Sequence, residues 1–379
     1  EAAPHHPVKL AHRSGHACVL NSHSLERVGI SIETPEPPGG FIEREPDTGE
    51  PNGLLFEMDS YIDGAIPPLS RGKLREGLRV AIKKCLSCGI TSIQDATSHN
   101  GVDEWRLFER LKHDGELPIR VYIMIGAGEF SDILERGLFF GYGDDRLKIG
   151  PVKIVLDETA GRLRPPQDEL NQLVLGAQRA GFQVAIHAIE EGAIEAAAIA
   201  LEYACGESPS GTHRHRIEHC SVCSPKLLGR LRDAHATIVT HPSFIYYSGE
   251  RYLATVPKNQ QRWLYRIGSF LESGLMTAAG SDCPVVPNNP IYGIYSAVTR
   301  RAEAGQFLLP SEGIAPIEAL KMYASNAAYA SFDEGRKGSI SIGKLADMVI
   351  LERDPTRVPV EEIKEIRVEI TIIDGKVVW

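Results

Sequence analysis

The chain has 379 residues, of which 42% are hydrophobic and 24% charged, as expected for a globular protein with one large domain or with a large and a small one. A formal net charge of −9 disfavours nucleic acid as a partner, because no basic stripe is present to release counterions from a phosphate backbone. No run of 18 or more apolar residues occurs, which excludes a membrane-spanning helix and with it a membrane partner.

The first 70 residues contain short apolar stretches interrupted by proline and glycine. Residues 41–44 and 53–57 flank Pro46-Asp47-Thr48-Gly49 and are predicted to form a β-hairpin. We therefore predict an N-terminal insert with a hairpin over residues 1–70.

From residue 70 onward, predicted amphipathic helices alternate with short apolar strands. This alternation is typical of a parallel sheet covered by helices, and it predicts an α/β fold, a (β/α)8 TIM barrel over residues 71–330. A closed barrel needs eight strands and the sequence supplies seven, so strand 1 is expected upstream of Glu1. The predicted strands are 91–95, 119–125, 152–157, 182–187, 216–219, 236–241 and 275–282.

Residues 331–379 change character again. Predicted strands at 347–351, 368–373 and 374–378, the last two joined at Asp374-Gly375, indicate antiparallel pairing with a tight turn. We predict that this segment is part of a small β-sandwich domain.

The seven cysteines do not suggest a disulfide framework, and their odd number favours reduced thiols in the cytoplasm. Two C-x-x-C pairs, Cys85/Cys88 and Cys220/Cys223, raise the alternative of a zinc ribbon. The first pair ends a predicted helix and the second follows a predicted strand, so buried packing thiols are the preferred interpretation.

Four predicted strand ends carry groups that can bind a metal: Lys153, His187, His219 and Asp282. The carboxyl ends of barrel strands converge on one mouth, and imidazole and carboxylate groups are natural ligands for divalent ions. A single histidine at a strand end is more often structural, and Asp282 alone is also compatible with a helix cap. Several such residues at one barrel face favour a metal site.

Four segments together resemble the amidohydrolase superfamily, and specifically amidohydrolase family 3, the branch of N-substituted formamide deformylases. They are Ile186-His187-Ala188-Ile189, Arg214-His215-Arg216-Ile217-Glu218-His219, Gly280-Ser281-Asp282-Cys283-Pro284-Val285 and Gly343-Lys344-Leu345-Ala346-Asp347-Met348. The resemblance implies a metal-dependent hydrolase whose ligands are an H-x-H on strand 1, a carboxylated lysine on strand 4, histidines on strands 5 and 6, and an aspartate on strand 8.

Carried over to this sequence, the resemblance implies carboxylated Lys153, His187, His219 and Asp282 as metal ligands, with zinc as the expected ion and Asp282 as the catalytic base. It further suggests His16, Arg251, Arg266 and His241 as substrate contacts; exposed surface positions are the alternative for the arginines. The strand-1 H-x-H has no match, because His213 and His215 have the spacing but lie in the polar approach to strand 6. Two further departures are Ser14 in place of an aspartate and Asp157-Glu158-Thr159 in place of D-G-S.

The implied activity is hydrolysis of carbon–nitrogen bonds in small amide or formamide substrates. Two alternatives stay open: a truncated or catalytically silent scaffold, and a lactone or sugar-derivative hydrolase on the same fold. Without strand 1 we expect an open barrel with at most one metal and little hydrolysis, and with exposed strand edges that invite association, including homo-oligomers.

Overall fold

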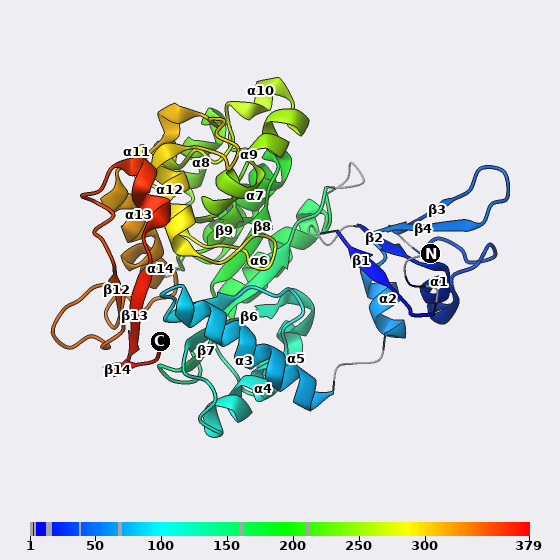
Figure 1. Ribbon diagram of the computed structural model, residues 1–379, viewed down its shortest axis with the longest axis horizontal. Helices are drawn as coiled ribbons and strands as arrows, with labels where there is room; N and C mark the ends of the chain where they lie inside the picture. Colours follow the sequence, from blue (N-terminus) through cyan, green and yellow to red (C-terminus); the bar gives the residue numbers. More distant parts are fainter. Residues whose placement is uncertain are drawn as a thin grey trace. The chain divides into compact units, whose positions relative to one another are not determined.

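A computed structural model describes residues 3, 5–12, 17–37, 39–66, 70–158, 163–209 and 213–379 of the chain (Figure 1). The chain divides into two compact units, Glu1–Leu78 and Arg79–Trp379. In the described ranges, none of the helices combines the length and the apolar character that crossing a membrane requires.

The N-terminal unit contains an antiparallel sheet in the order β1-β2-β4-β3. β3 and β4 pair across the predicted turn, with Phe41 opposite Phe56. Apolar residues on one face of the sheet, such as Leu20 and Leu55, form a small core with residues of the two helices, such as Leu25 and Ile62. The elements are β1 Lys9–Ala11, β2 Ala17–Leu20, α1 Ser22–Val28, β3 Phe41–Arg44, β4 Pro51–Phe56 and α2 Asp59–Ala65.

The larger unit is built on the seven parallel strands that the sequence predicts, in the order β11-β10-β9-β8-β7-β6-β5. Consecutive strands in the sequence are neighbours in space, so the sheet curls progressively as half of a barrel. In the part of the chain described, β5 and β11 are the two edges of this arc. The strands are β5 Ser92–Asp95, β6 Arg120–Gly126, β7 Leu147–Val155, β8 Val184–Ala188, β9 Arg216–His219, β10 Thr237–Thr240 and β11 Thr277–Ala279.

β7 begins five residues before the predicted strand, at Leu147. Residues 147–149 pair with β6, the register shifts between Ile123 and Ile125 of β6, and pairing resumes at Val152. Pro151 lies at this irregularity, where its missing N–H removes one ladder hydrogen bond. The sequence pattern therefore showed only the part of β7 that follows the proline.

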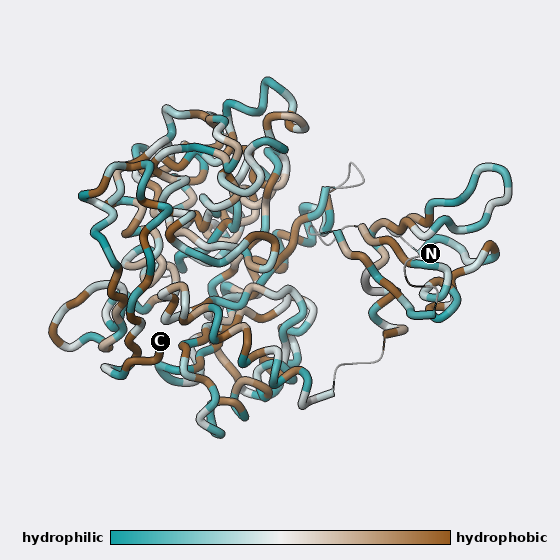
Figure 2. The backbone as a smooth tube through the Cα atoms, viewed as in Figure 1, coloured by the Kyte–Doolittle hydropathy of each residue, from teal (hydrophilic) through white to brown (hydrophobic). Residues whose placement is uncertain are grey.

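Helices cover the sheet, and hydrophobic residues gather in the interior of the larger unit (Figure 2). α7 faces the sheet with small residues, including Ala193, Ala197 and Ala200, which are almost completely buried. The helices after residue 70 are α3 Arg71–Ser87, α4 Val102–His113, α5 Phe130–Glu135, α6 Gln167–Arg179, α7 Glu191–Glu207, α8 Pro225–Asp233, α9 Ser243–Thr255, α10 Lys258–Gln261, α11 Ile267–Glu272, α12 Pro290–Thr299, α13 Pro316–Tyr323 and α14 Ser325–Ala330, with short 3-10 turns at Ala127–Glu129, Pro310–Glu312 and Val360–Glu365.

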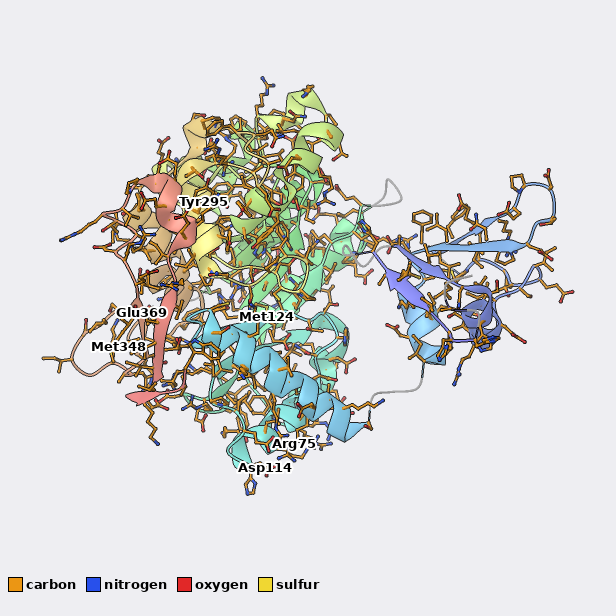
Figure 3. All side chains as sticks on the ribbon, viewed as in Figure 1. Arg75, Asp114, Met124, Tyr295, Met348 and Glu369 are labelled. Atoms are coloured by element: carbon orange, nitrogen blue, oxygen red, sulfur yellow. The ribbon has the colours of Figure 1, made fainter. Side chains whose placement is uncertain are left out.

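The C-terminal residues form a three-stranded antiparallel sheet, β12 Met348–Leu351, β13 Val368–Ile373 and β14 Lys376–Val377. Asp374 and Gly375 both have positive φ, as a tight two-residue hairpin turn requires. Arg120 at the start of β6 donates to Asp347 and Asp374, and these ion pairs join the small sheet to the barrel strands. Figure 3 labels Met348 and Glu369 on the small sheet and Met124 in β6.

Candidate functional site

The candidate site lies at the carboxyl ends of β7 to β11. Register pairs Lys153 of β7 with Ala185 of β8, and Ala185 with Arg216 of β9. Two residues closer to the carboxyl ends of the strands, His187 of β8 is paired with Glu218 of β9. Paired residues on parallel strands point to the same side and side chains alternate along each strand, so Lys153, His187, Arg216 and Glu218 all face the same interior.

His219 joins this group because its backbone leaves the strand conformation. Following Glu218, it would face the opposite side, but its φ of 70° and that of Cys220 at 50° are left-handed. The ring of His219 then lies 4.3 Å from that of His187 and 4.5 Å from that of His241, measured between centroids. Left-handed non-glycine residues are strained and occur preferentially at functional sites, which marks this turn as a candidate.

His241 and Asp282 come from the two strands that follow. His241 lies just after β10, is buried, and its ring packs against Gly280, where a Cβ would approach two ring atoms to 3.2 Å. The absence of a side chain at Gly280 therefore makes room for the His241 ring. Asp282 is partly exposed, has a φ of 55°, and is near enough to Lys153 and His241 to affect the pKa of each.

Burial disfavours the protonated form of the basic groups of the site. Burial lowers the pKa of His219 well below its ordinary value, and His241, His187 and Lys153 lower it further. Burial also lowers the pKa of His241 and of Lys153, against the opposing attraction of Asp282 and Glu218 in both cases. Imidazoles with unprotonated nitrogens are in the form that binds a metal.

A buried ion pair lies beside the imidazoles. Arg216 Nε donates to Glu218 Oε1 over 2.8 Å, and Arg216 Nη1 donates to Gln94 Oε1 of β5. Burial by itself would raise the pKa of Glu218, but Arg216 and Lys153 outweigh it and hold the pKa below its usual value. Arg216 and Glu218, two charged residues that alternate with Ile217 and His219 in a fully buried strand, were the sequence signal for this pair, although no role had been assigned to them.

Several buried polar atoms at this edge have no hydrogen-bond partner among the described residues. They are His219 Nδ1, Thr240 Oγ1, Ser243 Oγ and the two ring nitrogens of His241. The His241 ring lies against the backbone of Gly280, but without the geometry of a hydrogen bond. Because buried polar groups normally have partners, their concentration after β9 and β10 indicates a place for a ligand or ion.

The donor set suits a divalent metal, although its geometry is not that of an assembled site. No three histidine, cysteine, aspartate or glutamate side chains in the described ranges are arranged so that they could hold an ion. Lysine is not among those residue types, and it enters such a site only after carboxylation. The unpartnered Nδ1 of His219, on a ring whose pKa is lowered by burial, is the observation that fits a metal here.

The remaining predicted substrate contacts are Arg251 and Arg266, which have partners of their own, and His16. Arg251 is exposed on α9, with its guanidinium 5.2 Å from the centre of the Tyr252 ring. Arg266 donates to Glu312 over 3.2 Å and to Ser269 over 2.8 Å, beside a shallow cavity of about 350 Å³. His16 falls outside the described residues, and all three roles stay predictions.

Two aromatic residues that the sequence analysis did not select form a wall of the site. Phe244 lies 6.3 Å from His219 and 5.5 Å from His241 between ring centroids. Tyr265, 6.3 Å from Phe244, is buried and shares a hydrogen bond of 3.0 Å with the Tyr252 hydroxyl. The aromatic-rich stretch after strand 236–241 was the available signal.

The comparisons with known proteins agree with this fold. The profile of the Amidohydrolase family matches residues 1–379. The chain is 30% identical to the N-substituted formamide deformylase of Arthrobacter pascens and 28% identical to the putative amidohydrolase YtcJ of Bacillus subtilis, in each case over 99% of this chain and 74% of the relative.

Solved structures with the same fold include two uncharacterized metal-dependent hydrolases. The structure from Pyrococcus furiosus is 23% identical in sequence, with a TM-score of 0.74, and the match covers 94% of this chain and 74% of the Pyrococcus furiosus chain. The structure from Pyrococcus horikoshii is 21% identical in sequence, with a TM-score of 0.76, and the match covers 95% of this chain and 74% of the Pyrococcus horikoshii chain. The resemblance inferred from the motifs is confirmed: the chain belongs to the amidohydrolase family and is a hydrolase.

Proposed function

We propose that this chain is a metal-dependent hydrolase of carbon–nitrogen bonds in small, non-peptide amides or formamides. The observation that carries the proposal is the pair of buried imidazoles His219 and His241 at the carboxyl edge of the sheet, which have unpartnered ring nitrogens and pKa values lowered by burial, near Lys153 and Asp282. The bond type is suggested by the relative named as an N-substituted formamide deformylase.

The residues that would hold the ion are His187, His219, Asp282 and Lys153, the last as a carboxylated side chain. A mixed nitrogen and oxygen donor set favours zinc among the borderline divalent ions. When bound, the ion would supply a Lewis acid and a water of lowered pKa.

The charges around the site support a single divalent ion. Arg216 and Glu218 neutralise each other, and Lys153 as an ammonium would neutralise Asp282, so an added ion would leave two uncompensated positive charges in a largely buried site. Carboxylation changes Lys153 from one positive to one negative charge. Lys153 and Asp282 then carry two negative charges, which a divalent ion balances, so we expect metal binding to require carbon dioxide or bicarbonate.

Asp282 is the residue that we assign to proton transfer. It is partly exposed, so water and substrate can reach it, and its strained backbone fixes the carboxylate beside Lys153 and His241. In this role it accepts the proton of the attacking water and donates it to the leaving nitrogen.

The finer organisation is also a proposal. We assign residues 71–330 to the catalytic barrel, residues 1–70 to an insert and residues 331–379 to part of a small β-sandwich. The edges β5 and β11 would be paired by an eighth strand, supplied elsewhere in the protein or by a second copy of the chain. None of the seven cysteines, all of which lie in the described ranges, forms a disulfide, which supports a cytoplasmic location.

A substrate panel tests the activity directly. Zinc-loaded protein, as this chain and as a longer chain that includes preceding residues, is given N-alkyl and N-aryl formamides, acetamides and lactones, with Asp282→Asn as the matched control. Formamide or acetamide cleavage that depends on Asp282 supports the proposal. Hydrolysis of lactones alone would favour the lactonase alternative, and zinc binding without turnover in either chain would favour a silent scaffold.

A further inference from the structure

The Arg216–Glu218 pair is buried in the interior of the barrel. The side chains of Arg216 and Glu218 are 2% and 5% exposed, and Arg216 also reaches Gln94 on β5, four strands away in the sheet. Removing charged groups from water is unfavourable, and replacing a buried ion pair with apolar side chains is often neutral or stabilising. The retention of both charges at this position therefore calls for a purpose other than stability.

Glu218 faces the candidate site. It is register-paired with His187, and the ladder places Lys153 level with Arg216, one layer below, so that all four side chains face the same interior. It is also the buried carboxylate of this group, whereas Asp282 is partly exposed. Arg216 fixes its orientation through the 2.8 Å hydrogen bond to Oε1.

A carboxylated lysine keeps one N–H on Nζ, and this donor needs an acceptor in a buried site. Such an acceptor sets the rotation about the terminal bond of the side chain, and so sets the direction in which the new carboxylate points. Buried groups of this kind behind a metal ligand commonly orient it, and their loss weakens metal binding by about 10- to 100-fold.

We propose that Glu218, held by Arg216, is a positioning residue that accepts a hydrogen bond from Lys153 Nζ and orients this side chain toward the metal. The inference rests on the proposed function, since it assumes that Lys153 is a ligand. Glu218 would therefore act on the metal through Lys153, and would not itself be a metal ligand.

The test measures zinc affinity by competition with a chromophoric chelator in bicarbonate buffer. In Arg216→Met/Glu218→Met both charges are removed together, so neither is left buried alone, and we expect zinc affinity to fall about 10- to 100-fold while the metal-free protein unfolds near the wild-type temperature. The control Arg120→Met/Asp347→Asn disrupts a buried pair at the other end of the strands, with side chains 4% and 5% exposed. It should keep wild-type zinc affinity even if its unfolding temperature falls.

Two further measurements keep the inference falsifiable. Should the double variant not fold, Glu218→Asp keeps the charge and withdraws the carboxylate by one methylene, and we expect roughly tenfold weaker zinc binding. The visible spectrum of the cobalt-loaded Glu218→Asp protein should keep its band intensities, because the number of ligands is unchanged.

Wild-type zinc affinity in the double variant, or in Glu218→Asp, would overturn the inference, and so would a cobalt spectrum that reports a lost ligand. These outcomes leave the proposed function standing. Absence of zinc binding in the wild-type protein would instead remove the proposed function, and the inference with it.

Discussion

His215 provides a quantitative test of the structure because its two ring nitrogens have fixed hydrogen-bond roles. Val184 N–H donates to His215 Nδ1 over 3.0 Å, and His215 Nε2 lies 2.9 Å from Gln178 Oε1, so the proton of the neutral ring is on Nε2. Adding a second proton would break the bond from Val184. Burial, with a smaller effect of the stacked His213, lowers the pKa of His215 to about 3.

The sign and size of the pH effect follow from this pKa. In the unfolded chain His215 takes up a proton below its ordinary pKa of 6.5, whereas in the folded protein it stays neutral until the pH approaches 3. Its contribution to stability is therefore complete above pH 6.5 and decreases as the pH falls from 6.5 toward 3. Between pH 7.5 and 5.0 the loss is about 2 kcal/mol, at about 1.4 kcal/mol for each pH unit below 6.5.

The variant for this test is His215→Asn, whose side-chain oxygen can still accept from Val184 N–H but does not titrate. Urea unfolding at pH 7.5 and at pH 5.0 gives the change in unfolding free energy for each protein. The change should be about 2 kcal/mol smaller in the variant than in the wild type, because all other titrating groups are common to both. An equal pH dependence in the two proteins would refute the assignment of a buried neutral His215.

Two other substitutions test the catalytic assignment and a positioning element. Asp282→Asn should lower kcat by about 10²-fold or more in the complete enzyme without unfolding it, and near-normal turnover would mean that another group is the base. Arg300 is completely buried and donates to the carbonyls of Leu264, Tyr265 and Leu308 at 2.8–3.0 Å. Arg300→Met should lower the unfolding free energy by roughly 3–5 kcal/mol, measured by urea unfolding, and a loss below about 1 kcal/mol would contradict a structural role for these three bonds.

The alternation of helices and strands was enough to predict the seven parallel strands and their order. It also predicted that His187 and His219 would be neighbours, because both end adjacent strands. The Asp374-Gly375 turn was predictable for a similar reason, since this dipeptide adopts the positive φ values that a short hairpin needs.

Other features depend on contacts that a local pattern does not contain. Residues 258–272 form two helices, α10 and α11, and not one. The N–H of Tyr265 between them donates to the carbonyl of Ser221, and the carbonyl of Tyr265 accepts from Arg300. The left-handed turn at His219 was not predictable, because histidine has no strong preference for it. The same is true of the Arg216 contact with Gln94, which joins residues far apart in the sequence.

The central claim, a metal site at the carboxyl edge of the sheet, is tested most directly by zinc binding to this chain. Equilibrium dialysis with elemental analysis, in bicarbonate buffer, should find about one zinc per chain in the wild type, as expected for a single site that one divalent ion neutralises. Binding should be lost in His187→Ala, His219→Ala and Lys153→Met, and also when carbon dioxide and bicarbonate are removed. A wild-type chain that binds no zinc, or variants that bind it as the wild type does, would contradict the account.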